Sequence, residues 1–187
     1  MRGQTLGIAA VGLAGLLAAS AALGDDKEDA RFRAGAKKGL ASATITLKEA
    51  VQLALRKIPN SREVEAELEV DGDDIDYYVE VIAGGKHQVV EIDAVAGEVE
   101  AIEDEADEEE DYKKIEEEAQ RAKVTLLRAI DIAAARIEHG KMFEAAPDKV
   151  DGHLIYYFQL LQRDKFFEVS VDAATGKVLA AEEVEDK

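Results

Sequence analysis

Thr46–Val99 reads TLKEAVQLALRKIPNSREVEAELEVDGDDIDYYVEVIAGGKHQVVEIDAVAGEV, and this stretch decides the fold because it returns 79 positions later, without a gap, as Thr125–Val178. Repetition at a fixed spacing is typical of repeated architecture, so each copy tests the interpretation given to the other. The chain therefore contains two copies of one small module. Identical positions include Thr46/Thr125, Leu47/Leu126, Ala50/Ala129, Ala54/Ala133, Ile58/Ile137, Tyr77/Tyr156, Tyr78/Tyr157, Val90/Val169, Asp93/Asp172 and Gly97/Gly176.

Each copy opens with the pattern of an amphipathic helix. Thr46-Leu-Lys-Glu49 has the spacing of a capping box, in which the Thr hydroxyl and the Glu carboxylate cap helix amides reciprocally. Apolar residues then recur at helical spacing until Pro59 stops the helix. In the second copy Arg128 replaces the capping Glu, so we expect that helix to begin more weakly.

The period then changes to two, which indicates strands. Between Glu63 and Val70 acidic and apolar residues alternate, so one face of this strand is acidic. Gly-containing turns follow at 71–74, 84–85 and 93–97, and the second copy repeats the order. A module of about 55 residues lies near the lower limit for folding alone, so we expect the copies to share buried surface or to form a dimer.

The segments outside the repeats have different compositions. Residues 1–24 combine Arg2 with a charge-free Ala/Leu-rich stretch and small residues before Asp25, which predicts a signal peptide. An uncleaved membrane anchor is the alternative. For residues 25–44 we predict a flexible lead-in, and for residues 103–123 an acidic linker whose later half has helical spacing. The chain is thus expected to be exported to the periplasm or the extracellular space.

Acidic residues outnumber basic ones, at 41 against 23, which gives a net charge of −18. Residues 46–102 carry −9, whereas residues 125–181 carry only −1. A polyanion repels nucleic acid and anionic lipid headgroups, so neither is expected as a partner, and a membrane contact is expected only if the N-terminal segment is uncleaved. Basic proteins, peptides and divalent cations remain as candidate partners.

The closing segment Val169–Val178, VSVDAATGKV, has the pattern V-x-V-D-A-x-T-G-x-V of the PepSY domain, which the two repeats resemble over residues 45–102 and 124–181. The first copy departs from it, with Val95-Ala96 in place of Ala174-Thr175. The resemblance implies an α+β fold of two tandem cystatin-like modules, each with one helix packed on a 3–4-stranded antiparallel sheet. The modules would span residues 45–102 and 124–187, the second with an acidic tail.

The resemblance also implies a class of function. PepSY domains occur in propeptides of thermolysin-like secreted metallopeptidases and in exported bacterial proteins, where they bind or restrain peptidases without acting as catalysts. We therefore expect an inhibitor-like binding protein whose partner is a protein or peptide, with a protease as one candidate.

The residues for common catalytic and metal chemistry are missing from the sequence. The chain has no Cys, and His87, His139 and His153 stand at unrelated module positions without an HExxH motif. The turn Asp71–Asp76 resembles a calcium loop but has Ile75 and Asp76 where an EF-hand needs a ligand and a Gly, so a solvated turn is expected. We predict no catalytic residue, no metal ligand and no cofactor.

Aromatic pairs on the predicted strands are the best candidates for partner contact. Strand neighbours face opposite ways, so one Tyr of each pair should lie under the helix and the other on the open face of the sheet. Packing alone would explain both. The sharper hypothesis is a peptide-docking surface that includes neighbours such as Val79, because Tyr combines an apolar ring with a hydroxyl. Its candidate residues are Tyr77, Tyr78, Tyr156, Tyr157, Phe158, Phe166 and Phe167.

Three functions stay open at this point. The first is a non-catalytic exported module that engages a peptidase or another cell-envelope protein through a sheet face or edge. The second is an acidic protein whose first module and linker bind divalent cations. The third is a structural spacer that holds an anchored N-terminus away from a membrane.

Overall fold

The computed structural model describes residues 26–104, 114, 117–119 and 121–184. The predicted signal peptide, most of the predicted linker and the last three residues lie outside these ranges. Within them, no helix is both long enough and apolar enough to cross a membrane.

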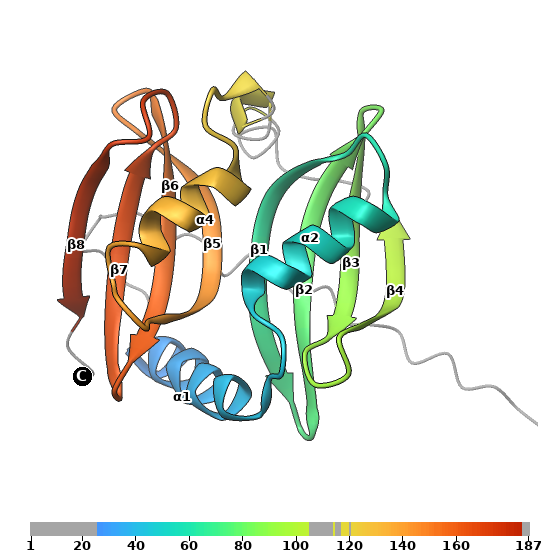
Figure 1. Cartoon of the computed structure of the whole chain (residues 1–187), viewed down its shortest axis with the longest axis vertical. Helices are drawn as coiled ribbons and strands as arrows, with labels where there is room; N and C mark the ends of the chain where they lie inside the picture. Colours follow the sequence, from blue (N-terminus) through green and yellow to red (C-terminus); the bar gives the residue numbers. More distant parts are fainter. Residues whose placement is uncertain (1–25, 105–113, 115–116, 120, 185–187) are drawn as a thin grey trace, which may run out of the picture.

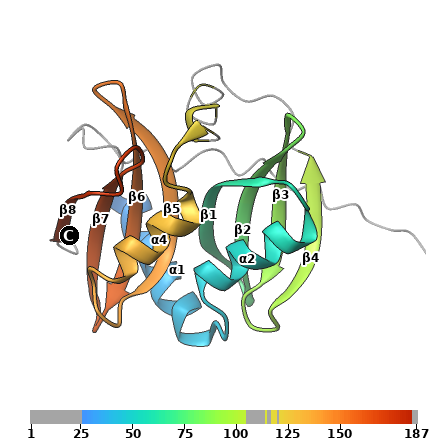
Figure 2. The same cartoon turned by 45° about the horizontal axis from the view of Figure 1, so that its top comes forward.

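The described residues form a mixed fold of helices and an antiparallel sheet, as predicted, but the sheet is continuous. Its strand order is β4-β3-β2-β1-β5-β6-β7-β8, so the expectation of two separate 3–4-stranded sheets is wrong. Helices α2 and α4 lie side by side on one face of this sheet (Figures 1 and 2). The elements are α1 (Asp26–Ser42), α2 (Leu47–Lys57), β1 (Arg62–Asp71), β2 (Asp74–Ala83), β3 (Lys86–Asp93), β4 (Glu98–Asp104), α4 (Leu126–Ala134), β5 (Lys141–Val150), β6 (His153–Gln162), β7 (Lys165–Asp172) and β8 (Val178–Val184).

The two halves meet at a seam between β1 and β5. These strands pair at only two positions, Ala66 with Ala145 and Glu67 with Glu144. Ala66 and Ala145 are themselves equivalent positions of the repeat, so the halves meet as the two subunits of a symmetric dimer would, with the same strand on both sides. The small Ala side chains allow the two backbones to approach. The expectation that the copies share buried surface is confirmed.

Backbone details confirm the repeat. A bulge interrupts β1 between Glu63 and Glu65, and an equivalent one interrupts β5 between Met142 and Glu144. Gly84 and Gly85 take φ angles of +61° and +80°, and the equivalent Arg163 and Asp164 take +48° and +65°. Two successive positive φ angles suit the tight hairpin turns that match strand twist. The turn therefore keeps its geometry even where Gly is replaced.

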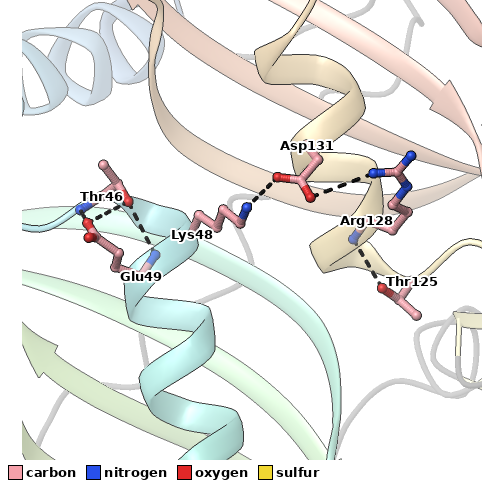
Figure 3. Close-up of polar contacts among 6 residues, drawn as sticks. All are labelled: Thr46, Lys48, Glu49, Thr125, Arg128 and Asp131. Atoms are coloured by element: carbon pink, nitrogen blue, oxygen red, sulfur yellow. Dashed lines mark hydrogen bonds and ion pairs between the residues drawn. The ribbon is translucent and has the colours of Figure 1, made fainter.

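The starts of α2 and α4 differ as their sequences predict. Thr46 and Glu49 form the complete capping box at α2 (Figure 3). At α4 the Thr125 hydroxyl accepts from the Arg128 amide at 3.1 Å, but no carboxylate from this helix completes the box. Instead, the Leu127 amide donates to Glu63 Oε1 at 3.1 Å. The first half thus supplies an acceptor that the second half lacks.

A further contact links the two helices. Lys48 Nζ of α2 donates to Asp131 Oδ1 of α4 at 2.5 Å, and Arg128 lies 3.9 Å from the same carboxylate (Figure 3). Both members of the Lys48–Asp131 pair are partly exposed, so its contribution to stability is small. It shows which faces of α2 and α4 meet.

Residues 26–42 form α1, so the prediction of a flexible lead-in at 25–44 is wrong for them. Helix α1 crosses the end of the seam below α2 and α4 in Figure 1 and packs against β1 and β5. Ala36 and Leu40 are buried, and a Cβ on Gly39 would lie 2.9 Å from the Leu68 side chain, so Gly39 permits a close approach to β1. From β5, Lys141 Nζ donates a hydrogen bond to the Leu40 carbonyl of α1 at 2.6 Å.

Candidate binding surface

Four of the seven residues predicted to bind a partner lie in the core. Tyr77, Tyr156 and Phe158 are fully buried, and Phe166 is nearly so. The Tyr77 and Tyr156 hydroxyls donate at 3.2 Å to the carbonyls that precede α2 and α4, those of Ile45 and Val124. The two Tyr side chains link α2 and α4 to the sheet, and all four residues are buried in the folded chain. Val79, the proposed neighbour on the docking surface, is also fully buried.

Helix α1 explains the burial of Phe166. The ring makes an edge contact with Phe143, which in turn packs on Phe32 of α1. The Arg33 guanidinium lies 5.4 Å and the Lys37 ammonium 4.8 Å from the Phe166 ring centroid, both within cation–π range. Because no helix was predicted from the sequence for residues 26–42, the burial of Phe166 by α1 could not be predicted either.

The remaining three candidates are half-buried. Tyr78 and Tyr157 lie on the sheet face opposite α2 and α4, so the prediction that each Tyr pair divides between the two faces is confirmed. Phe167 alternates with Phe166 and shares the helix-side face with Val169. Tyr78 and Tyr157 are therefore the predicted residues that the open face can present to a partner.

Tyr78 lies among carboxylates. The strand register places Glu67 beside Tyr78 and Glu65 beside Glu80, and Glu69 follows on the same face. We call the surface made by Glu65, Glu67, Glu69, Tyr78 and Glu80 the acidic face. Across the seam, Glu144 of β5 pairs with Glu67 and extends the negative surface into the second half. The sequence predicted an acidic strand face here, but not its continuation through β5.

The charges of the acidic face are held in unfavourable surroundings. Burial, together with Glu69, Glu144 and Glu80, raises the pKa of Glu67 to about 8. Burial also raises the pKa of Glu69. Crowded carboxylates with little water favour their neutral forms, whereas a cationic side chain brought close to them would stabilise the charged forms. The surface is electrostatically suited to Lys or Arg.

The second half lacks two of these four carboxylates at the equivalent positions, while Glu144 and Asp148 stand for Glu65 and Glu69. Ala146 stands for Glu67, and Gln159 stands for Glu80, while Tyr157 keeps the position of Tyr78. Both replacements occupy the same sheet positions one module further on. The acidic face is therefore denser in the first half, and the fold tolerates the replacement of Glu67 and Glu80.

A second cluster of carboxylates lies further from the seam. Asp76 of β2, Glu91 of β3 and Glu100 of β4 each place a carboxylate oxygen within 4.8 Å of the other two, and we call them the carboxylate triad. Burial and then Glu91, Glu100, Asp93 and Asp74 raise the pKa of Asp76 to about 6. The sequence prediction of no metal ligand did not consider this set, because its members come from three strands and are separated in the chain.

The outer strands of the sheet offer another kind of surface. Strands β4 and β8 are the outermost ones in the described sheet, and Ile102 and Leu179 on them are large apolar residues that are 40% and 48% exposed. Outer strands are where extended peptides add to sheets.

Comparison with known proteins gives a match over both repeats. The sequence profile of the PepSY family, described as the peptidase propeptide and YPEB domain, matches residues 44–103 and again residues 123–182. No curated protein matches the chain.

Among solved structures, the chain is similar to a protein from Clostridium difficile 630 with 21% identity and a TM-score of 0.44, over 76% of this chain and 95% of that one. It is similar to the YpmB protein from Bacillus subtilis with 18% identity and a TM-score of 0.32, over 73% and 96% of the two chains. The C-terminal domain of YpeB from Bacillus megaterium matches with 10% identity and a TM-score of 0.28, over 75% and 98%.

Proposed function

The chain belongs to the PepSY family, and from that premise we propose that it is a non-catalytic, exported binding protein that engages or restrains a peptidase or another cell-envelope protein. The family description, which names peptidase propeptides, supports a protein partner. The missing catalytic motifs are consistent with binding rather than catalysis. Within this proposal, each half of the sheet with its own helix is one copy of the cystatin-like module.

The acidic face is the observation that carries this proposal. Three Glu side chains of one strand lie beside Glu80 and the half-buried Tyr78, and burial raises the pKa of two of them, Glu67 and Glu69. A basic segment of a partner would pair with these carboxylates while its apolar parts cover the Tyr78 ring. Restraint of a peptidase would follow if that segment lies next to the peptidase cleft.

Two variants that each lose three carboxylates separate this surface from general acidity. The acidic-face variant is Glu65→Gln/Glu67→Ala/Glu80→Gln, in which Ala and Gln are the residues that the second half carries at the positions of Glu67 and Glu80. The control variant, Asp71→Asn/Asp73→Asn/Asp74→Asn, removes three charges from the exposed turn between β1 and β2. Both variants keep the described core unchanged.

The experiment immobilises wild type and both variants, passes envelope extract over them, and assays the captured and unbound fractions for peptidase activity and inhibition. We expect salt-sensitive capture by wild type and the control, and at least about tenfold weaker capture by the acidic-face variant, since close charge pairs contribute about 1.5 kcal/mol or more. Equal capture by all three proteins would contradict the acidic face as the binding surface. No captured or inhibited peptidase at micromolar concentration would contradict the peptidase assignment.

A further inference from the structure

The carboxylate triad is assembled by the geometry of three neighbouring strands. Asp76 pairs with Asp93 and Tyr78 pairs with Glu91, so Asp76 and Glu91 are diagonal neighbours on one sheet face. Glu91 pairs with Ala101, whereas the next residue of β3, Ile92, pairs with Val99. Glu100 is thus the extra residue of a bulge. Bulges redirect side chains, and this one brings a third carboxylate to the other two.

Asp76 differs from the carboxylates around it because nothing donates to it. Its residue is only 8% exposed, yet it forms no hydrogen bond or ion pair with the described residues. Neighbouring Asp93 accepts from the amides of Val95 and Ala96, and Glu91 accepts from the Tyr78 hydroxyl at 3.1 Å. A carboxylate that no protein group donates to, and that lies within 4.8 Å of two others, is unfavourable and calls for an explanation. Its oxygen points to the other two carboxylates of the triad, which are negative as well.

The fold itself does not require these charges. In the second half, the positions equivalent to Asp76, Glu91 and Glu100 hold Ile155, Ser170 and Leu179. The bulge is nevertheless retained there, between Ser170 and Val171. The same backbone thus forms with an apolar, a hydroxyl and a second apolar side chain. Three carboxylates in the first half therefore need a reason other than folding.

We propose that Asp76, Glu91 and Glu100 bind a hard divalent cation of the calcium type on the first half of the sheet. Ca²⁺ prefers oxygen ligands at about 2.3–2.6 Å, so two ligands on opposite sides of the ion are about 5 Å apart, which the triad spacing of 4.8 Å or less allows. Mg²⁺ requires shorter distances and stricter octahedral geometry, so Ca²⁺ is the better fit. Exposed Glu100 provides the side from which the ion and its waters enter.

The cation would supply what Asp76 lacks. A divalent ion offsets the repulsion among three carboxylates, and the Tyr78 hydroxyl holds Glu91 in place as a ligand. This site shares no ligand with the Asp71–Asp74 turn, although Asp74 contributes to the raised pKa of Asp76. It also extends beyond the proposed partner binding, because it can be tested on the purified protein without a partner.

Calorimetric titration with calcium chloride tests the site. Wild type should show one saturable binding event with a dissociation constant of about 10⁻⁴–10⁻³ M, the range of extracellular calcium modules. The variant Asp76→Ile/Glu91→Ser/Glu100→Leu adopts the residues of the second half, and we expect at least about tenfold weaker binding. Asp76→Asn, which keeps the side-chain shape, should weaken binding as well. The turn variant Asp71→Asn/Asp73→Asn/Asp74→Asn has the same charge loss and should retain the event.

Terbium luminescence adds a readout that depends on position. The chain has no Trp, so Tyr residues are the aromatic groups that can transfer energy to a bound Tb³⁺ ion. The Tyr78 hydroxyl donates to Glu91 of the triad, so tyrosine-excited emission should rise when Tb³⁺ binds and fall when Ca²⁺ displaces it. The emission should be weaker in the Tyr78→Phe variant and unchanged in the Tyr157→Phe variant. The proposal is overturned if wild type shows no saturable event, if the triad variant binds as wild type does, or if the turn variant loses binding equally.

Discussion

Among the residues of the acidic face, Glu67 has the carboxylate whose charged form the fold disfavours most clearly. It lies on a central strand, next to Glu69 and opposite Glu144 across the seam, and burial is the largest cause that raises its pKa to about 8. An acid whose pKa is raised on folding binds its proton more tightly in the folded state. The contribution of Glu67 to the stability of the fold therefore declines as the pH rises from 4.5, the ordinary pKa of a Glu side chain, toward 8.

Glu67→Gln should remove this pH dependence. At about pH 8 wild-type Glu67 loses its proton, whereas the amide of the variant is never charged. We therefore expect the free energy of unfolding of the variant to exceed that of wild type by about 1 kcal/mol or more at this pH. At about pH 4, below both pKa values, the two proteins should be similar in stability. Urea denaturation across this range measures the difference. Glu98→Gln on exposed β4 is the control, and a Glu67→Gln curve parallel to wild type at all pH values would contradict the assignment.

Single residues also show how far local patterns extend. Strand alternation alone divided each Tyr pair correctly, because which way a strand side chain points is a local property. Burial is not local. Phe158 was expected on a docking surface but faces α4, and Phe166 faces away from α4 but is covered by Arg33, Lys37 and Phe143.

Among the elements, α4 depends on the other half of the chain for its N-terminus. Glu63 is nearly fully buried, and its carboxylate accepts from the Leu127 amide in the first turn of α4. Negative charge at a helix N-terminus also interacts favourably with the helix dipole. The weak cap predicted from Arg128 is thus compensated by a residue 64 positions earlier in the chain, which no local pattern reveals.

Glu63→Met should destabilise the whole protein by about 1–2 kcal/mol, since it removes a cap acceptor and leaves the Leu127 amide without it. Met is the residue at the equivalent position of the second half, Met142, so the strand accepts it. Chemical denaturation gives the loss, and amide hydrogen exchange should show the first turn of α4 opening more often. Glu49→Gln at α2 is a local comparison. A Glu63→Met protein as stable as wild type, with unchanged exchange in α4, would refute the cross-half cap.

Helix α1 was missed for a physical reason. Phe32, Ala36, Leu40 and Ala43 recur every three or four positions, which is a helical signal, but Gly35 and Gly39 lower helix propensity and the segment is otherwise charged. Gly39 lies where the helix approaches Leu68 and Val70 closely. The residue that weakens the local signal is the one that tertiary packing requires.

At the scale of the whole molecule, the two modules were predicted but their junction was not. Turns, caps and strand alternation are local, and the repeat checks each of them twice. Pairing of β1 with β5 joins residues 79 positions apart, and only the small Ala66 and Ala145 at equivalent positions hint at a close backbone approach. The single sheet thus depends on contacts that sequence periodicity does not encode.

These contacts cross the seam on several levels, so the halves should unfold together. Strand pairing at Ala66, the Glu63 cap and the Lys48–Asp131 contact each join the halves, and α1 packs against both β1 and β5. A module of about 55 residues has little stability alone. Heating should therefore give one transition in which the calorimetric and van't Hoff enthalpies agree, as they do for two-state unfolding.

Leu47 and Leu126 provide a matched test, because they are equivalent, buried residues at the starts of α2 and α4. Leu47→Ala and Leu126→Ala each create a cavity and should each cost about 2–5 kcal/mol. If the halves are coupled, either variant lowers the midpoint of the same single transition, and hydrogen exchange accelerates in β2 and β6 alike. If the halves were independent, each variant would lower the unfolding temperature of its own half only, and the other half would unfold in a second transition at the wild-type temperature. Two such transitions would show that the seam joins the modules without stabilising them.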